Sequence, residues 1–258
     1  GNVAPEILVA ADMTGIRDIV KIGGAQAIAA LAYGTDSVSA VDKIAGPGNV
    51  FVTLAKKRVF GVVDIDLIAG PSEILIIADE NADPEKIAAD MLSQAEHDAY
   101  ASSILISDSV PLAKKVREAL ENQIGGLSRK AIAEEALEKY GALIVVSTMA
   151  EAVSLSNRIA PEHLELMVKD PAVLVNDIRN AGAVFLGEYT PESVGDYYAG
   201  PSHTLPTSGA ARFSSGLSVL SFLKLSSLLS FEKEDLAACS DTVTALAEAE
   251  GLTAHAQS

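Results

Sequence analysis

The chain has 258 residues, of which 49% are hydrophobic and 21% charged, so it can bury a sizeable core and is not a disordered chain. Its 35 acidic residues against 19 lysines and arginines give a formal charge of -16, which argues against nucleic acid or an anionic membrane as partner. Cys239 is the single cysteine, and no stretch has the roughly 20 apolar residues of a membrane-spanning helix, so we expect a cytoplasmic protein.

Short β-branched runs alternate with amphipathic helical stretches from Asn2 to about Leu225. This alternation is typical of βα units on a largely parallel sheet and predicts an α/β fold. The clearest helix is predicted from Asp83-Pro84, an N-cap followed by proline, to about Tyr100, and a last helix over 231–250. Strands are predicted at 18–22, 62–67, 73–77, 103–107, 142–147, 165–168 and 183–187.

The tripeptide Ala-Gly-Pro recurs at 45–47, 69–71 and 199–201, each time where a strand pattern ends. A single copy has a simple alternative explanation, because Gly-Pro ends secondary structure wherever it occurs. Three similar copies favour turns that form a site.

Two histidines have neighbours that could serve chemistry. Gln94 and His97 are three residues apart and share a helix face, which would suit a metal pair or simply a helix end that rises into solvent. Glu162-His163 falls between a loop and a strand, where an imidazole could act as base and a carboxylate could activate water. The alternative is a Glu-His dipeptide exposed on the surface. The segment 195–203 holds an acid, two tyrosines and a third histidine, which is hard to explain as core.

The usual signs of a dinucleotide or thiol enzyme are weak. No Gly-x-Gly-x-x-Gly fingerprint follows a predicted strand, and Gly23-Gly24-Ala25-Gln26 is only a weak pointer to nucleotide phosphate. Cys239 lies in an amphipathic pattern without an activating neighbour, so we interpret it as a packing residue.

Six ordered segments nevertheless resemble the histidinol dehydrogenase family. They are residues 23–35 (GGAQAIAALAYGT), 43–49 (KIAGPGN), 69–73 (AGPSE), 94–97 (QAEH), 160–164 (APEHL) and 200–207 (GPSHTLPT). The resemblance implies an NAD-dependent oxidation of histidinol to histidine through histidinaldehyde, the last step of histidine biosynthesis. It also implies a zinc ion that positions the substrate.

The resemblance also implies roles for individual residues. His163 would accept the alcohol proton, and Glu162 would activate water for the second oxidation. The implied zinc ligands are Gln94, His97, Asp196 and His255, with His255 supplied by the partner chain of a homodimer. Substrate would be contacted by these ligands, by His163, and by Ser72, His203 and Glu250, with Glu250 also contributed across the interface. NAD would be contacted by Gln26 and Asn49.

We therefore expect two incomplete Rossmann-like α/β domains with mostly parallel sheets and a small helical C-terminal tail. Residues 1–72 would bind NAD, 73–217 would bind zinc and carry catalysis, and 218–258 would exchange between subunits. The N-terminal portion usual in the family is expected to be absent. Two other hypotheses stay open: a zinc-binding dimerisation module that does not turn over substrate, and a zinc hydrolase that does not use NAD.

Overall fold

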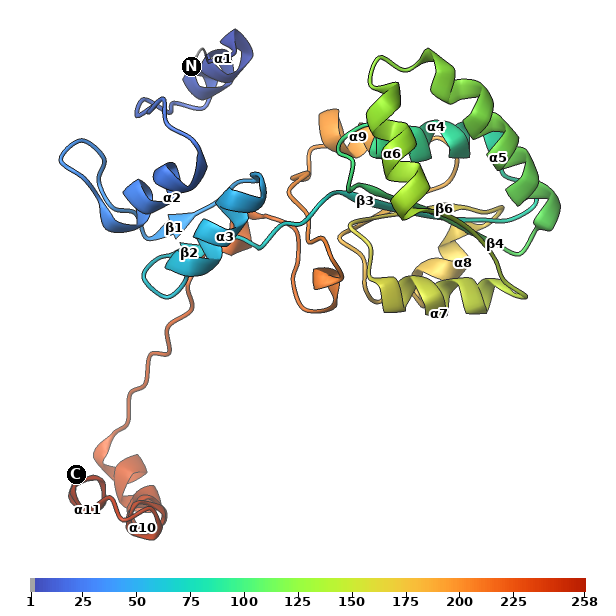
Figure 1. Ribbon diagram of the computed structural model, residues 1–258. Coiled ribbons are helices and arrows are strands. Elements are labelled where there is room, and N and C mark those ends of the chain that lie inside the picture. The colour runs from blue at the N-terminus through green and yellow to red at the C-terminus, as the bar shows by residue number, and fades with distance from the viewer. Residues whose placement is uncertain (1–2) are drawn as a thin grey trace. The chain divides into compact units, whose positions relative to one another are not determined.

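Figure 1 shows the computed structural model of the protein, which describes residues 3–258. The chain forms two compact units, Gly1–Phe222 and Leu223–Ser258, and each is described by itself. The first unit contains a two-stranded and a five-stranded sheet, and every strand pair in both is parallel. The predicted α/β class with parallel sheets is therefore confirmed. None of the helices in the described part of the chain combines the length and apolar character needed to cross a membrane.

The larger sheet has the strand order β5-β4-β3-β6-β7, so β3 is central and β4 and β6 flank it. The register places Ile74 beside both Ser103 and His163, so strands β3 and β6 begin at the same end of the sheet. The strands are β3 (Glu73–Ala78), β4 (Ser102–Ser107), β5 (Gly141–Val145), β6 (His163–Met167) and β7 (Ala183–Leu186).

Helices cover both faces of this sheet, as Figure 1 shows. On one side lie α4 (Pro84–Ala95), α5 (Val110–Gln123) and α6 (Lys130–Tyr140), and on the other α7 (Met149–Ile159) and α8 (Pro171–Val175). Alternate residues of β3 point to opposite faces of the sheet. Ile74 and Ile76 pack in one core cluster, and Leu75 and Ile77 pack in the other. Because β3 is buried on both faces, its sequence is a continuous apolar run rather than an alternating one.

Helix α4 begins as predicted. The Asp83 side chain accepts a hydrogen bond from the Glu85 amide, and Pro84 occupies the first turn. The predicted end near Tyr100 is wrong, because the helix stops at Ala95 and the chain turns, with the His97 amide donating to the Gln94 carbonyl. His97 therefore lies just beyond the helix rather than on its face.

The smaller sheet and its helices precede Ser72. They comprise α1 (Pro5–Met13), α2 (Gly24–Tyr33), β1 (Lys43–Ile44), α3 (Val50–Val59) and β2 (Asp64–Ile65). The strand predicted at 18–22 is wrong: that segment is exposed and forms neither helix nor strand, so its apolar residues meet no partner strand in the described residues. The strand predicted at 62–67 is confirmed only for two residues, and β1 was not predicted.

The remaining elements are short, apart from the last long helix. They are α9 (Glu192–Tyr197), three 3-10 turns (Ile124–Gly126, Ala210–Arg212 and Val219–Phe222), α10 (Lys233–Ala249) and α11 (Thr253–Gln257). The helix predicted over 231–250 is confirmed by α10, which starts with a capping box between Glu232 and Asp235. In the second unit α11 packs on α10, with the Leu252 amide donating to the Ala247 carbonyl at 2.8 Å.

Candidate active site

A cavity of about 1050 Å³ opens in the first unit, at the end of the larger sheet where β3 and β6 begin. Residues from the Ala-Gly-Pro turns at 45–47 and 69–71 line it, which favours the site-forming interpretation of those two copies. Seven of the residues predicted for the site also line it: Asn49, Ser72, His97, Glu162, His163, Asp196 and His203. Gln26, which is exposed on α2, is not among the lining residues in the described part of the chain.

His163 is the first residue of β6, and its side chain is only 5% exposed. Its Nδ1 lies 3.0 Å from the Glu73 carbonyl oxygen. A carbonyl can only accept, so Nδ1 carries the proton and Nε2 holds the free lone pair. Nε2 has no hydrogen-bond partner among the described residues. Burial lowers the pKa of His163, which keeps the imidazole neutral. The ring is therefore prepared to accept a proton at Nε2.

Glu162 lies beside this base and is also buried, with 7% of its side chain exposed. Its Oε2 accepts a hydrogen bond from the Glu73 amide at 2.9 Å, so Glu73 orients both members of the dipeptide through its backbone. Burial raises the pKa of Glu162 to about 8, and repulsion from nearby carboxylates such as Glu192 adds to the rise. The alternative of an exposed surface dipeptide is wrong.

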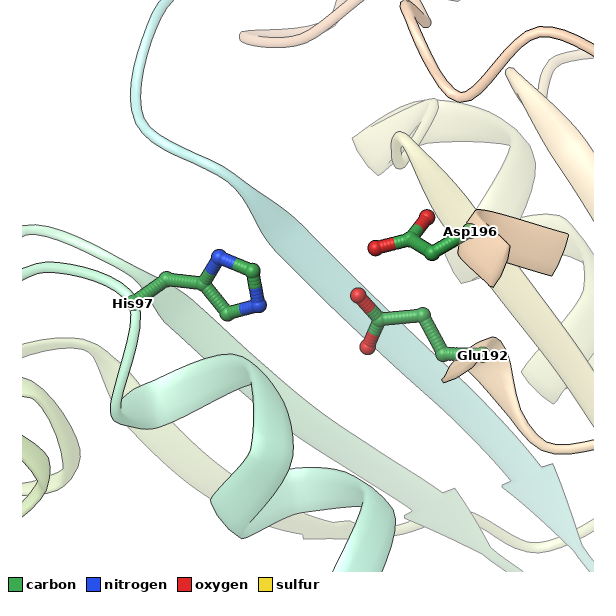
Figure 2. Close-up of side chains that lie close together, drawn as sticks. All are labelled: His97, Glu192 and Asp196. Carbon is green, nitrogen blue, oxygen red and sulfur yellow. The ribbon is translucent and has the colours of Figure 1, made fainter. Parts of the chain in front are cut away.

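Three side chains form a cluster with metal-ligand chemistry in the cavity wall. Ligand atoms of His97, Glu192 and Asp196 all lie within 4.8 Å of one another. Figure 2 shows His97 approaching from the turn after α4, and the two carboxylates facing it from α9. Glu192 and Asp196 are four residues apart, so one helical turn presents both on one side. One imidazole and two carboxylates suit zinc, which accepts nitrogen and oxygen ligands.

Gln94 joins this cluster through Glu192 and is fully buried. In the amide orientation that satisfies hydrogen bonding, its Nε2 donates to both oxygens of Glu192, at 3.1 and 3.2 Å. Gln94 is not among the residues that line the cavity in the described part of the chain, so its role as a zinc ligand stays a prediction. Sequence reasoning missed Glu192, although its spacing from Asp196 on a short helical pattern was a usable signal.

A second acid pair adjoins Glu192. Glu165 and Asp90 are neighbouring buried carboxyl groups, and repulsion from Asp90 adds to the effect of burial on the pKa of Glu165. Burial raises the pKa of Glu165 to about 9 and that of Asp90 to about 6. Glu165 Oε1 also accepts a hydrogen bond from the Glu192 amide at 2.9 Å. Glu165 therefore fixes the start of α9, the helix that carries both carboxylates of the cluster.

The pH dependence of stability should reveal this pair. The folded-state pKa of Glu165 is raised, so folding favours its neutral form; this contribution is intact at pH 4 and is lost as pH rises toward 9. Glu165→Gln removes the cost of ionising the buried group. We expect its free energy of unfolding relative to wild type to rise by at least about 1 kcal/mol between pH 5 and pH 8.

Urea titrations of metal-free protein at both pH values measure this difference. The exposed Glu138→Gln on α6 is the matched control, with an expected change near zero. A stability difference between Glu165→Gln and wild type that is the same at pH 5 and pH 8 would show that Glu165 is ionised throughout.

Two predicted residues belong to the second unit. Glu250 caps the end of α10, and His255 lies in α11; both are exposed within that unit. Their roles stay predictions. Asn49 lines the cavity, but its side chain also caps α3 by accepting from the Phe51 and Val52 amides at 3.1 and 3.2 Å. Its local structural role is therefore evident, and its contact with NAD stays a prediction.

Comparison with known proteins gives a consistent result. The family model described as histidinol dehydrogenase matches residues 1–258. Histidinol dehydrogenases of Clostridium acetobutylicum and Bacillus subtilis are 57% and 53% identical over 258 residues. The solved histidinol dehydrogenase of Elizabethkingia anophelis superposes with a TM-score of 0.95 at 43% identity. Each match covers 100% of this chain but only 60%, 60% and 59% of the relative.

Proposed function

The chain belongs to the histidinol dehydrogenase family, and on that basis we propose that it oxidises histidinol to histidine with NAD as the electron acceptor. The observation that carries the proposal is the unpartnered Nε2 of buried His163, which lies with Glu162 in the same cavity as the cluster of His97, Glu192 and Asp196. The cavity thus holds a base, a second carboxyl group and a candidate cation site. Because the chain spans about 60% of the length of its curated relatives, the activity is proposed for this chain rather than carried over from them.

The residues present fit a zinc ion. His97 and Asp196 offer nitrogen and oxygen ligands, and Gln94 offers a carbonyl oxygen once its amide nitrogen bonds Glu192. We propose these three as ligands with His255 as the fourth, and Glu192 as the group that orients Gln94. When bound, zinc would bind the imidazole and amine of histidinol and so orient the substrate. It would not need to generate a nucleophile.

In the first oxidation, His163 takes the hydroxyl proton of histidinol at Nε2. Its Nδ1 proton stays bonded to the Glu73 carbonyl, so the ring keeps its orientation while its charge changes. Asn49 and Gln26 would hold NAD, which would accept the hydride that leaves the same carbon. The product is histidinaldehyde.

In the second oxidation, Glu162 takes a proton from the water that attacks the aldehyde. This needs the ionised carboxylate, whereas burial raises the Glu162 pKa to about 8. A cation at His97 and Asp196 would favour the ionised form, because opposite charge nearby lowers the pKa of a carboxyl group. The hydrate would then give a second hydride to a second NAD and a hydroxyl proton to His163, which leaves the carboxyl group of histidine.

The other proposed roles complete the site. Ser72 and His203 line the cavity and would contact substrate. Glu250 and His255 would enter from the partner chain of a homodimer in the cytoplasm. Glu162 and Glu192 line the cavity, and a cationic ligand such as the histidinol amine would favour their ionised forms.

The test is NADH formation, followed by absorbance, from the purified chain with histidinol, NAD and zinc. We expect two NADH per histidinol consumed and loss of turnover when a chelator removes the metal. Zinc bound at one per chain without NADH would contradict the proposed activity and favour a zinc-binding dimerisation module. Metal-dependent hydrolysis that does not require NAD would favour a zinc hydrolase instead.

A further inference from the structure

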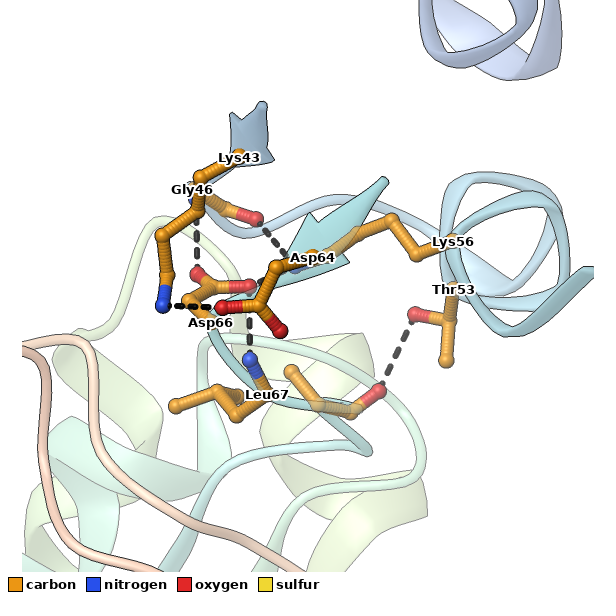
Figure 3. A network of polar contacts seen from close by, with 8 residues as sticks. Lys43, Gly46, Thr53, Lys56, Asp64, Asp66 and Leu67 are labelled. Carbon is orange, nitrogen blue, oxygen red and sulfur yellow. Dashed lines mark hydrogen bonds and ion pairs between the residues drawn. The ribbon is translucent and has the colours of Figure 1, made fainter. Parts of the chain in front are cut away.

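A buried ion pair lies beside the smaller sheet, outside the cluster of His97, Glu192 and Asp196. Lys56 comes from α3 and Asp66 follows β2; their side chains are 3% and 1% exposed. The ammonium group contacts Asp66 Oδ1 directly (Figure 3). Removing two charges from water is costly, and an apolar pair of similar size is often as stable. Stability alone therefore gives little reason for this pair.

The pair holds the backbone of one residue, Gly46. Lys56 Nζ donates to the Gly46 carbonyl at 2.9 Å, and Asp66 Oδ2 accepts from the Gly46 amide at 2.8 Å. Figure 3 shows both bonds converging on this residue. Gly46 has φ of 126°, a region that favours glycine, so the chain turns sharply at the point where both of its polar groups are held. Asp66 Oδ1 also accepts from the Leu67 amide at 2.6 Å, which fixes the carboxylate itself.

Gly46 begins the loop that leads into the cavity. Pro47, Gly48 and Asn49 follow it and line the cavity, and α3 starts immediately afterwards. The Asp66 amide donates to the Ile44 carbonyl, so the loop and Asp66 both lie at the carboxyl ends of the parallel strands β1 and β2. Open parallel sheets bind nucleotides at that edge.

The same helix also reaches the turn on the substrate side. Thr53 Oγ1 donates to the Ala69 carbonyl at 3.0 Å, shortly before Ser72 and β3 (Figure 3). Helix α3 is thus bonded at Lys56 to the start of the 46–49 loop and at Thr53 to the 69–71 turn. A change at Lys56 should therefore alter the geometry of the loop more than that of the His163 side of the cavity.

We propose that Lys56 and Asp66 are positioning residues for the cofactor: they hold the loop 46–49 in the shape that binds NAD. The proposal rests on the proposed function, because it takes this loop as part of the NAD site. Neither residue needs to touch the cofactor. Their role is to keep most molecules in the loop conformation that binds NAD, before NAD arrives.

The test compares NAD affinity in the full chain by isothermal titration calorimetry. The variant combines Lys56→Met with Asp66→Asn, which removes both charges and leaves no unpaired buried charge to unfold the protein. If only about a tenth of the molecules keep the competent loop, the dissociation constant for NAD rises about tenfold. The control is Lys57→Met, an exposed neighbour on α3 that loses the same charge. Zinc content and amide hydrogen exchange are measured on all three proteins.

The proposal is supported if the double variant binds NAD more weakly than wild type while Lys57→Met does not. The double variant should also show faster amide exchange at 46–52 and unchanged zinc content. Equal NAD affinity and equal exchange in wild type and double variant would overturn the positioning role while leaving the proposed function intact. Absence of NAD binding by the zinc-loaded wild type would overturn the cofactor assignment and the inference together.

Discussion

Replacing His163 with alanine is expected to lower the rate of histidinol oxidation by about 100-fold or more, the usual contribution of a positioned general base. The loss follows from geometry: Nε2 is the free nitrogen of a ring whose Nδ1 is bonded to the Glu73 carbonyl. Zinc content should not change, because His163 is not among the clustered ligands. Steady-state rates and metal analysis of the same preparation check both statements.

Two further measurements separate a base from a merely structural residue. Added imidazole should restore part of the rate of His163→Ala, because the vacated space can accept a small base. The matched variant His163→Gln can still donate to the Glu73 carbonyl but offers no basic nitrogen, so it should stay slow and gain nothing from imidazole. Near wild-type turnover in the glutamine variant would exclude His163 as the base.

Replacing His97 with alanine is expected to weaken zinc binding by more than about 100-fold, beyond the usual effect of losing a residue that only orients a ligand. His97 is the one imidazole in the described cluster, and the remaining donors there are oxygens. Competition with a chromophoric chelator measures the dissociation constant. His203→Ala is the matched control, since His203 lines the same cavity outside the cluster and should leave zinc affinity unchanged. Equal losses in both variants would mean that zinc binds elsewhere in the cavity.

The buried part of the fold could be predicted from sequence because its signals are local. β3 is a run of apolar residues between turns, and α4 starts at Asp83-Pro84, whose side chain and ring fix the first turn. The two-residue β1 was missed because so short a strand carries no periodicity. The segment 18–22 has strand composition, but composition cannot supply a partner strand.

Site residues could be predicted where several functional side chains stand close together in the sequence. They could not be predicted where their role depends on contacts with a distant part of the chain. The Glu162-His163 dipeptide and the Gln94–His97 segment stood out, and the cavity brings Glu162, His163 and His97 together. Glu192 did not, because its importance lies in hydrogen bonds to Gln94 from a distant part of the chain. The role of Lys56 was equally hidden, since only folding shows that it meets Asp66.

The location of His163 at the start of an interior strand also limits how the protein can move during a reaction. Strands β3 and β6 each pair with a strand on both sides in the larger sheet, and buried core strands generally open last in hydrogen exchange. We therefore expect the base and its Glu73 partner to belong to a slowly exchanging part of the first unit. Any opening that admits substrate or releases product has to come from exposed segments around the cavity, such as Tyr197-Tyr198. Mutations that make these exposed segments more rigid would slow substrate entry and product release without altering the rate of proton transfer.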